Sequence, residues 1–135
     1  MELWIATDLS PTSDDAVSAA FGWARSLGAK VVLLHVVHDP ELAPALTNDV
    51  PGDVAKARAA LERAVKRLGE GLTCRAEVRT ADDVAAEIVK ASAAADYLFL
   101  GSHGRSGFDR LRLGSVAMSV LRHATVPLVC LPSRR

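Results

Sequence analysis

Short runs of apolar residues alternate along this chain with longer segments whose apolar residues recur at helical spacing. The clearest runs are residues 3–6, 31–37, 97–100 and 126–131. Runs of this length are typical of strands that are buried on both faces of a parallel sheet. Strands that alternate with helices indicate an α/β fold with helices on both faces of the sheet. With 135 residues, the chain is long enough for one such domain, which we expect to span residues 1–135.

The first helix has the clearest boundaries in the sequence. Ser10 is a favoured N-cap residue, and Pro11 fits the first helical position, where its missing N–H costs nothing. Gly28 is placed to end the helix, because glycine readily adopts the left-handed conformation that closes many helices. The spacing predicts an apolar face made of Ala16, Ala20, Trp23 and Leu27.

Three further helices are expected from apolar spacing and from capping residues. Asp53 is the predicted N-cap of the second helix, and Ser115 is that of the fourth. Either Thr80 or Asp82 is expected to cap the third. The second helix is highly charged, and we interpret its charges as a solvated face without a partner. These charged residues are Lys56, Arg58, Glu62, Arg63, Lys66 and Arg67.

The third and fifth strands have the patterns of edge strands. Residues 74–79 alternate apolar and charged side chains, which predicts a strand with one exposed face at a sheet edge. Pro127 lies near the start of the run 126–131, and proline is confined to edge strands or bulges because it has no N–H to donate. Cys74 and Cys130 form no C-x-x-C pair, so we interpret each as a small buried core residue.

Charge and composition argue against several classes of partner. Sixteen basic and sixteen acidic residues give a formal net charge of zero, so no overall field draws the chain to nucleic acid or to an acidic membrane. The few aromatic residues do not interleave with a basic stripe, which argues against a surface that stacks on bases. No apolar run reaches the length of a membrane span, and the first residues lack a signal-peptide pattern. We therefore expect a cytoplasmic protein without a nucleic-acid or membrane partner.

The segment GSHGRSGFDRLRLGSVA at residues 101–117 combines glycines, arginines and a helix start. It follows a buried strand directly, and glycines let a backbone approach a ligand closely. A helix that begins at its end offers unpaired N–H groups and the positive end of its dipole to an anion. The glycines and arginines are Gly101, Gly104, Gly107, Gly114, Arg105, Arg110 and Arg112. This combination predicts a phosphate-binding loop.

The spacing of these glycines leaves a second interpretation open. It matches neither G-x-G-x-x-G nor G-x-x-x-x-G-K-[ST], so the dinucleotide fingerprint and the P-loop are both absent. On the residues alone, the segment can equally be a turn that only joins a strand to a helix. His103 lies in it, and we interpret this histidine as contributing its backbone, because no paired carboxylate or nucleophile can be placed beside it.

The same loop resembles the nucleotide-binding signature of the universal stress protein family. The motif is Gly101-x-x-Gly104, nine residues, and then Gly114-Ser115. The resemblance extends to Asp8 after the opening strand, and to two longer stretches in the same order. These are GAKVVLLHVV at residues 28–37 and GSVAMSVLRHATVPLVCLP at residues 114–132. Apart from a variable segment near residues 38–53, it covers essentially the whole chain.

The resemblance implies a Rossmann-like fold, an open parallel five-stranded sheet in the order 3-2-1-4-5 with helices on both faces. In such a sheet, ligands bind beyond the carboxyl ends of the strands, where the strand order reverses. The implied ligand is ATP, or else AMP or ADP, with Mg²⁺. The implied binding residues are Ala6, Thr7, Asp8, Val36, Leu100, Gly101, His103, Gly104, Gly114, Ser115 and Val116.

The family's roles carry over to matching positions. The glycine-serine motif would surround the phosphates, Asp8 would reach the ribose or a phosphate-bound Mg²⁺, and Val36 and Leu100 would flank adenine. The residues themselves leave other readings open. Asp8 can be a turn or cap residue, and the two aliphatic residues can be ordinary core. The chain departs from the family at Leu9, where glycine is frequent, and in lacking G-x-P before the third helix.

The function that the resemblance implies is regulatory. It is that of a small stress-response homodimer, paired through strand 126–131, with at most slow ATP hydrolysis. A nucleotide-free protein-interaction module and a Mg²⁺-dependent ATPase remain as alternatives. A phospho-receiver domain is rejected, because the third strand ends in Val78-Arg79-Thr80 without an aspartate and no lysine follows Leu131.

Overall fold

The computed structural model of the chain describes residues 1–40, 49–102 and 113–132. Within this part, five strands form one parallel sheet in the order β3-β2-β1-β4-β5, and four helices connect them. The elements are β1 (Glu2–Ala6), α1 (Pro11–Leu27), β2 (Lys30–His38), α2 (Val50–Leu68), β3 (Cys74–Ala81), α3 (Val84–Ala91), β4 (Tyr97–Gly101), α4 (Ser115–His123) and β5 (Leu128–Leu131). The predicted fold class and strand order are confirmed.

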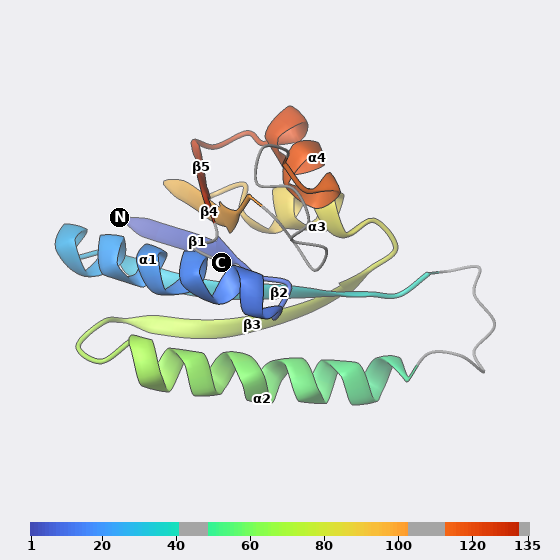
Figure 1. Cartoon of the computed structure of the whole chain (residues 1–135), viewed down its shortest axis with the longest axis horizontal. Helices are drawn as coiled ribbons and strands as arrows, with labels where there is room; N and C mark the ends of the chain where they lie inside the picture. Colours follow the sequence, from blue (N-terminus) through green and yellow to red (C-terminus); the bar gives the residue numbers. More distant parts are fainter. Residues whose placement is uncertain (41–48, 103–112, 133–135) are drawn as a thin grey trace.

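The sheet is covered on both faces, as the apolar runs predicted. Alternate residues of β1 enter two separate cores, because successive side chains of a strand point to opposite faces. Leu3 and Ile5 pack with α1 and α2, whereas Trp4 and Ala6 pack with α3 and α4. Figure 1 shows α2 on one side of the sheet and α3 with α4 on the other. The sheet is thus the central layer of three.

The boundaries of α1 follow the sequence prediction. Ser10 is its N-cap residue with Pro11 in the first turn, and Gly28 closes it in the left-handed conformation, with φ of 63°. The predicted apolar face is only half right. Ala16 and Ala20 are buried, but Trp23 is 50% and Leu27 49% exposed. The buried face of the helix instead includes Val17, Phe21 and Ala24 beside Ala16 and Ala20. Trp23 instead sets its ring edge-on against Phe99, with centroids 5.7 Å apart.

The other three helices begin at residues that differ from the prediction. Helix α2 starts four residues earlier than expected, because Asp49 rather than Asp53 is its N-cap residue and accepts a hydrogen bond from the Gly52 N–H. Helix α3 is capped by Asp83, which accepts from the Ala86 N–H at 3.0 Å, so neither Thr80 nor Asp82 is the cap. Ser115 is the first residue of α4, and Gly114 is its N-cap residue.

The wrong cap predictions for α2, α3 and α4 have the same cause. Several residues near each helix start can cap, and the one that does is set by backbone geometry, which the sequence pattern does not contain. Pro51 also suits the first turn of a helix, so it did not delay the start of α2.

The two edges of the sheet are β3 and β5, as predicted. On β3, Arg79 forms ion pairs with Glu77 of the same strand and with Glu87 of α3. β5 is shorter than predicted, since it starts at Leu128 rather than at residue 126. Pro127 precedes it and accepts from the Leu98 N–H through its carbonyl.

The two cysteines differ from the prediction in degree. Cys74 and Cys130 are half-buried, not fully buried, because each lies on an edge strand with no neighbouring strand beyond it. Each still packs against one of the two cores. Burial raises the pKa of both thiols, so at neutral pH the thiolate form that reacts is disfavoured.

The strand order reverses at β1, which lies between β2 and β4. The chain leaves β1 toward β2 and later returns to place β4 on the other side of β1. The carboxyl ends of these three strands therefore meet at one edge of the sheet, where open α/β sheets bind ligands. Among the described residues, no helix has both the length and the apolarity to cross a bilayer.

Candidate functional site

A pocket of about 1050 Å³ opens beyond the carboxyl ends of β1, β2 and β4. It lies where the strand order predicted a ligand site. Of the predicted binding residues, it is lined by Ala6, Thr7, Asp8, Val36, Leu100, Gly101, Gly114, Ser115 and Val116. The remaining two, His103 and Gly104, lie outside the described residues. The structure thus brings together side chains from both halves of the chain.

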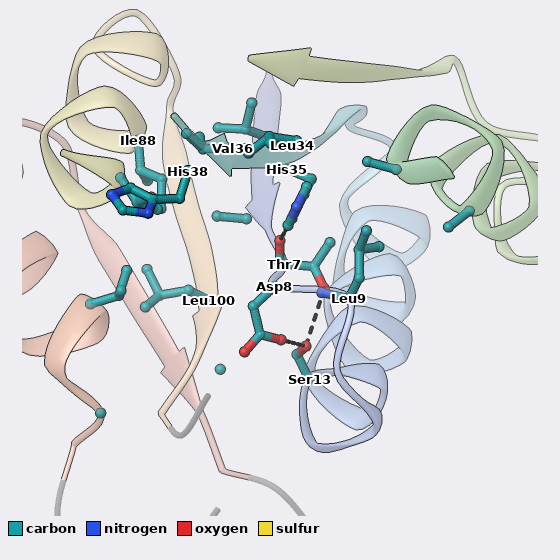
Figure 2. A pocket seen from close by; sticks show the side chains of 18 of the residues that line it. Thr7, Asp8, Leu9, Ser13, Leu34, His35, Val36, His38, Ile88 and Leu100 are labelled. Carbon is teal, nitrogen blue, oxygen red and sulfur yellow. Dashed lines mark hydrogen bonds between the residues drawn. The ribbon is translucent and has the colours of Figure 1, made fainter. Parts of the chain in front are cut away.

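The turn from β1 into α1 is held by its own side chains. The Asp8 carboxylate accepts from the Ser10 N–H at 2.9 Å and from the Ser13 hydroxyl at 2.6 Å. The Ser13 hydroxyl is also 3.1 Å from that of Thr7. Figure 2 shows the Thr7 and Asp8 side chains converging on Ser13. Asp8 therefore does serve as the turn residue that one interpretation of the sequence expected, and it lines the pocket as well.

Leu9 takes the backbone conformation of a glycine. Its φ is 64°, and it is the only non-glycine residue with a positive φ in the described part of the chain. Its N–H donates to the Thr7 hydroxyl at 3.0 Å, which helps hold the turn. A left-handed conformation costs an L-residue about 1–2 kcal/mol. The chain therefore keeps the turn shape that glycine would favour, and in return Leu9 packs against the core under α1 and α2.

His35 fixes the end of β1 to β2. Its Nδ1 lies 2.7 Å from the carbonyl oxygen of Thr7. Because a carbonyl oxygen can only accept, Nδ1 carries the proton of this bond. His35 is thus a sheet histidine whose ring hydrogen bond is satisfied. It also lines the pocket (Figure 2), which the sequence pattern did not indicate.

One wall of the pocket is apolar. Val36 and Leu100 are 6% and 5% exposed, and both belong to the core beneath α3 and α4. They are thus core residues and pocket residues at once, so the two interpretations of the sequence are compatible. Ile88 of α3 completes the wall, and Figure 2 shows it with Leu100 across the pocket from Leu9 and Ser13.

The N-terminus of α4 forms another wall. The Gly114 N–H donates to the Ser102 carbonyl at 2.7 Å, which ties the two ends of the intervening segment together. The first bond within the helix runs from the Met118 N–H to the Gly114 carbonyl. The N–H groups of Ser115, Val116 and Ala117 precede that bond, and no capping side chain accepts a hydrogen bond from them. These residues line the pocket, and Ala117 is one that sequence reasoning missed.

Helix α2 contributes a wall that the sequence analysis did not expect. Asp53, Lys56, Ala60 and Arg63 line the pocket, although we interpreted the charges of this helix as a solvated face. The helical period identifies which face is apolar, but it does not tell which polar residues border a neighbouring element. The pattern of charges alone could not have separated Lys56 and Arg63 from the rest.

The described residues hold no cluster of three His, Cys, Asp or Glu side chains that could bind a metal ion by themselves. Near the pocket mouth, His38 and Asp82 approach to 4.0 Å, with both side chains largely exposed. Asp83 is occupied as the cap of α3.

Comparison with known proteins identifies the family to which a chain with this fold and pocket is similar. Residues 2–132 match the model of the universal stress protein family. Among curated relatives, Universal stress protein Rv2005c of Mycobacterium tuberculosis is 30% identical over 132 residues, 93% of this chain and 43% of its own length. A universal stress protein of Mycolicibacterium smegmatis is 32% identical over 135 residues, 93% and 46%. The chain spans less than half the length of these relatives.

Solved structures share the fold. The hypothetical protein MJ0577 superposes with a TM-score of 0.84 at 23% identity, covering 99% of this chain and 96% of its own. The universal stress protein of Archaeoglobus fulgidus in complex with dAMP has a TM-score of 0.71 at 24% identity, covering 96% of both chains. An Arabidopsis thaliana universal stress protein family protein with AMP bound has a TM-score of 0.66 at 23% identity, covering 99% and 92%. Because residues 2–132 match the family model, this chain belongs to the universal stress protein family.

Proposed function

We propose that this chain is a cytoplasmic ATP-binding regulatory protein of the stress response, with at most slow ATP hydrolysis. The observation that carries the proposal is the N-terminus of α4, where three residues whose amides have no capping side chain line a pocket at the switch point of the sheet. Family members from Archaeoglobus and Arabidopsis have been solved with dAMP and AMP bound. These relatives support an adenine nucleotide as the ligand.

The phosphate groups belong at the α4 wall of the pocket. The amides of Ser115, Val116 and Ala117 can donate to phosphate oxygens, and the positive end of the helix dipole favours the negative charge. The hydroxyl of Ser115 adds a further donor. Gly114 has φ of −61° and ψ of 160°, a conformation open to any residue. Its glycine is therefore best explained by the room it leaves for a phosphate group.

The nucleoside fits the remaining walls. Adenine would lie against Val36, Leu100 and Ile88, whose aliphatic surfaces suit a flat apolar ring. The ribose would lie near Thr7 and Asp8 at the end of β1. Mg²⁺ would arrive on the phosphates and take Asp8 as a protein ligand, since oxygen ligands suit this ion and it is commonly held by one or two carboxylates plus phosphates. The ion would supply charge neutralisation for the triphosphate.

Titration calorimetry of ATP with Mg²⁺ into nucleotide-stripped protein tests the proposal. We expect binding in the micromolar range and its loss in Gly114→Val, because the valine side chain occupies the space of a phosphate group. The thermal unfolding midpoint should stay nearly unchanged, since φ at this position suits valine. The absence of binding by the wild-type protein with its fold intact would favour a protein-interaction module. Fast turnover of ATP would favour a Mg²⁺-dependent ATPase.

We further propose that two copies pair through β5. This edge strand is apolar, and α4 beside it exposes Val116, Met118 and Leu121 at 41%, 37% and 51%. Such an edge promotes association unless it is paired or covered. The carbonyls of Pro127 and Leu131 accept from the N–H groups of Leu98 in β4 and of Ser102 directly after it. The backbone groups of Leu128 and Cys130 therefore point the other way, because strand backbones alternate.

Sedimentation equilibrium tests the dimer. Cys130→Pro removes an N–H that points away from β4, and should give a folded monomer because no bond within the sheet is lost. Cys130→Ala keeps the N–H and should remain dimeric. A wild-type protein that stays monomeric at micromolar concentration, or a dimer unaffected by the proline, would contradict pairing through β5.

A further inference from the structure

Two cationic side chains of α2 border the pocket without an evident structural task. Lys56 and Arg63 line it, and both residues are exposed. They are seven positions apart, so they lie on the same face of the helix two turns from one another. Neither forms a hydrogen bond or ion pair with another residue in the described part of the chain. Their charges are thus available to a ligand.

The same pocket contains acidic groups that oppose an anionic ligand. Asp8 and Asp53 are the carboxylates among its described lining residues. Their two negative charges are balanced by Lys56 and Arg63, so the formal charge of these four side chains is zero. If the cations were neutralised, a nucleotide would have to pass two uncompensated carboxylates to reach the N-terminus of α4. The cations therefore decide whether the approach to the pocket attracts or repels phosphate groups.

We propose that Lys56 and Arg63 are steering residues that attract the phosphate groups of an adenine nucleotide and raise its rate of entry. The proposal rests on the nucleotide binding proposed above. Exposed charges act over roughly the Debye length, about 10 Å at 0.1 M ionic strength. They therefore speed the encounter of a charged ligand more than they strengthen the final complex. The walls formed by α4 and the strands hold the bound nucleotide.

The test compares two double variants of the same helix. Lys56→Gln/Arg63→Gln removes the two charges at the pocket. Arg58→Gln/Lys66→Gln removes two charges from exposed residues of α2 that do not line it. Both variants change the net charge by the same amount, and all four side chains are exposed, so neither should disturb the fold.

Stopped-flow kinetics with a fluorescent ATP analogue gives the association and dissociation rates. At an ionic strength of about 0.02 M, we expect Lys56→Gln/Arg63→Gln to lower kon by about three- to tenfold. The dissociation rate should be unchanged, and the difference in kon should vanish near 0.5 M salt. The control variant should resemble wild type. Binding of uncharged adenosine, measured by calorimetry, should be the same in all three proteins.

Failure of the steering proposal can be distinguished from failure of the proposed nucleotide binding. If wild-type protein binds no nucleotide, the proposed function is wrong. If it binds, but the two double variants slow association equally, only net charge matters and the role of Lys56 and Arg63 is refuted. A faster dissociation with unchanged association would also overturn the proposal, because the side chains would then contact the bound phosphates rather than steer them.

Discussion

Two walls of the pocket differ in whether their polar groups already have hydrogen-bond partners within the protein. In the β1–α1 turn the polar side chains bond to each other, since the Ser13 hydroxyl forms hydrogen bonds with the Asp8 carboxylate and the Thr7 hydroxyl. The N-terminus of α4 does the reverse, since its N-cap residue is glycine and no side chain caps it. The polar groups of the first wall thus stabilise the turn, whereas those of the second have no capping side chain and suit the phosphate binding proposed above. Polar residues at a pocket can thus belong to the fold or to the function.

This difference predicts that stability depends mainly on the turn, and that phosphate binding depends mainly on the start of α4. Changes in the turn should lower the free energy of unfolding because buried polar groups lose partners. Changes at the start of α4 should affect nucleotide binding with little effect on the free energy of unfolding. The variants below test the turn, in order of decreasing effect.

Asp8→Ala should have the largest effect on stability. It removes the acceptor of the Ser10 N–H and of the Ser10 and Ser13 hydroxyls, which should lower the free energy of unfolding by about 2–3 kcal/mol. Asp14→Ala is the matched control, because Asp14 is an exposed acid in the first turn of α1 and should cost less than about 1 kcal/mol. Urea denaturation measures both. Equal losses would show that Asp8 acts only through its charge at the helix start.

Ser13→Ala should have a smaller effect. The Ser13 residue is 4% exposed and its hydroxyl bonds to Asp8 and Thr7, so its loss should cost about 1–2 kcal/mol. Ser18→Ala, on the exposed side of the same helix, should stay within about 0.5 kcal/mol of wild type. Nucleotide affinity should be nearly unaffected by Ser13→Ala. A Ser13→Ala variant that kept its stability but lost nucleotide binding would contradict the structural role of Ser13.

Leu9 offers the smallest effect and the finest test of the turn. In Leu9→Gly, relief of the left-handed strain is offset by lost packing and by the greater freedom of glycine in the unfolded chain, so stability should change by less than about 1 kcal/mol. Leu9→Val should be the less stable variant, because a β-branched residue fits φ of 64° poorly. Thermal denaturation ranks the two. A valine variant as stable as the glycine variant would argue that the turn can change shape freely.

The sequence predicted the fold well because its signals are strong and mutually consistent. Apolar runs of strand length, the Ser10-Pro11 helix start and Gly28 each correspond to one backbone state. Caps of α2, α3 and α4 were misplaced because several capping residues compete within a few positions. The exposure of Trp23 and Leu27 was missed because more than one apolar stripe of α1 fits the helical period, and packing against the sheet decides which stripe is buried.

The site was predictable only in part. The residues after β1 and at the start of α4 could be assigned to one place, because a parallel sheet gathers the carboxyl ends of its strands. The contribution of α2 was not predictable, since Lys56 and Arg63 look like the other charges of that helix. Their position depends on how α2 packs over β2 and β3, which is a tertiary property. The internal bond of the Gly114 amide to Ser102 was equally hidden from the sequence.

The central claim is that the amides at the start of α4 hold the phosphate groups of an adenine nucleotide. The most direct measurement is an ¹⁵N-resolved NMR titration of the protein with ATP and Mg²⁺, following backbone amides. Donation to phosphate oxygens predicts that the Ser115, Val116 and Ala117 amides shift most. The Leu9 and Ser10 amides, which already donate to Thr7 and Asp8, should shift less. If ATP binds but the largest shifts fall in the β1–α1 turn while the α4 amides stay in place, the account is wrong.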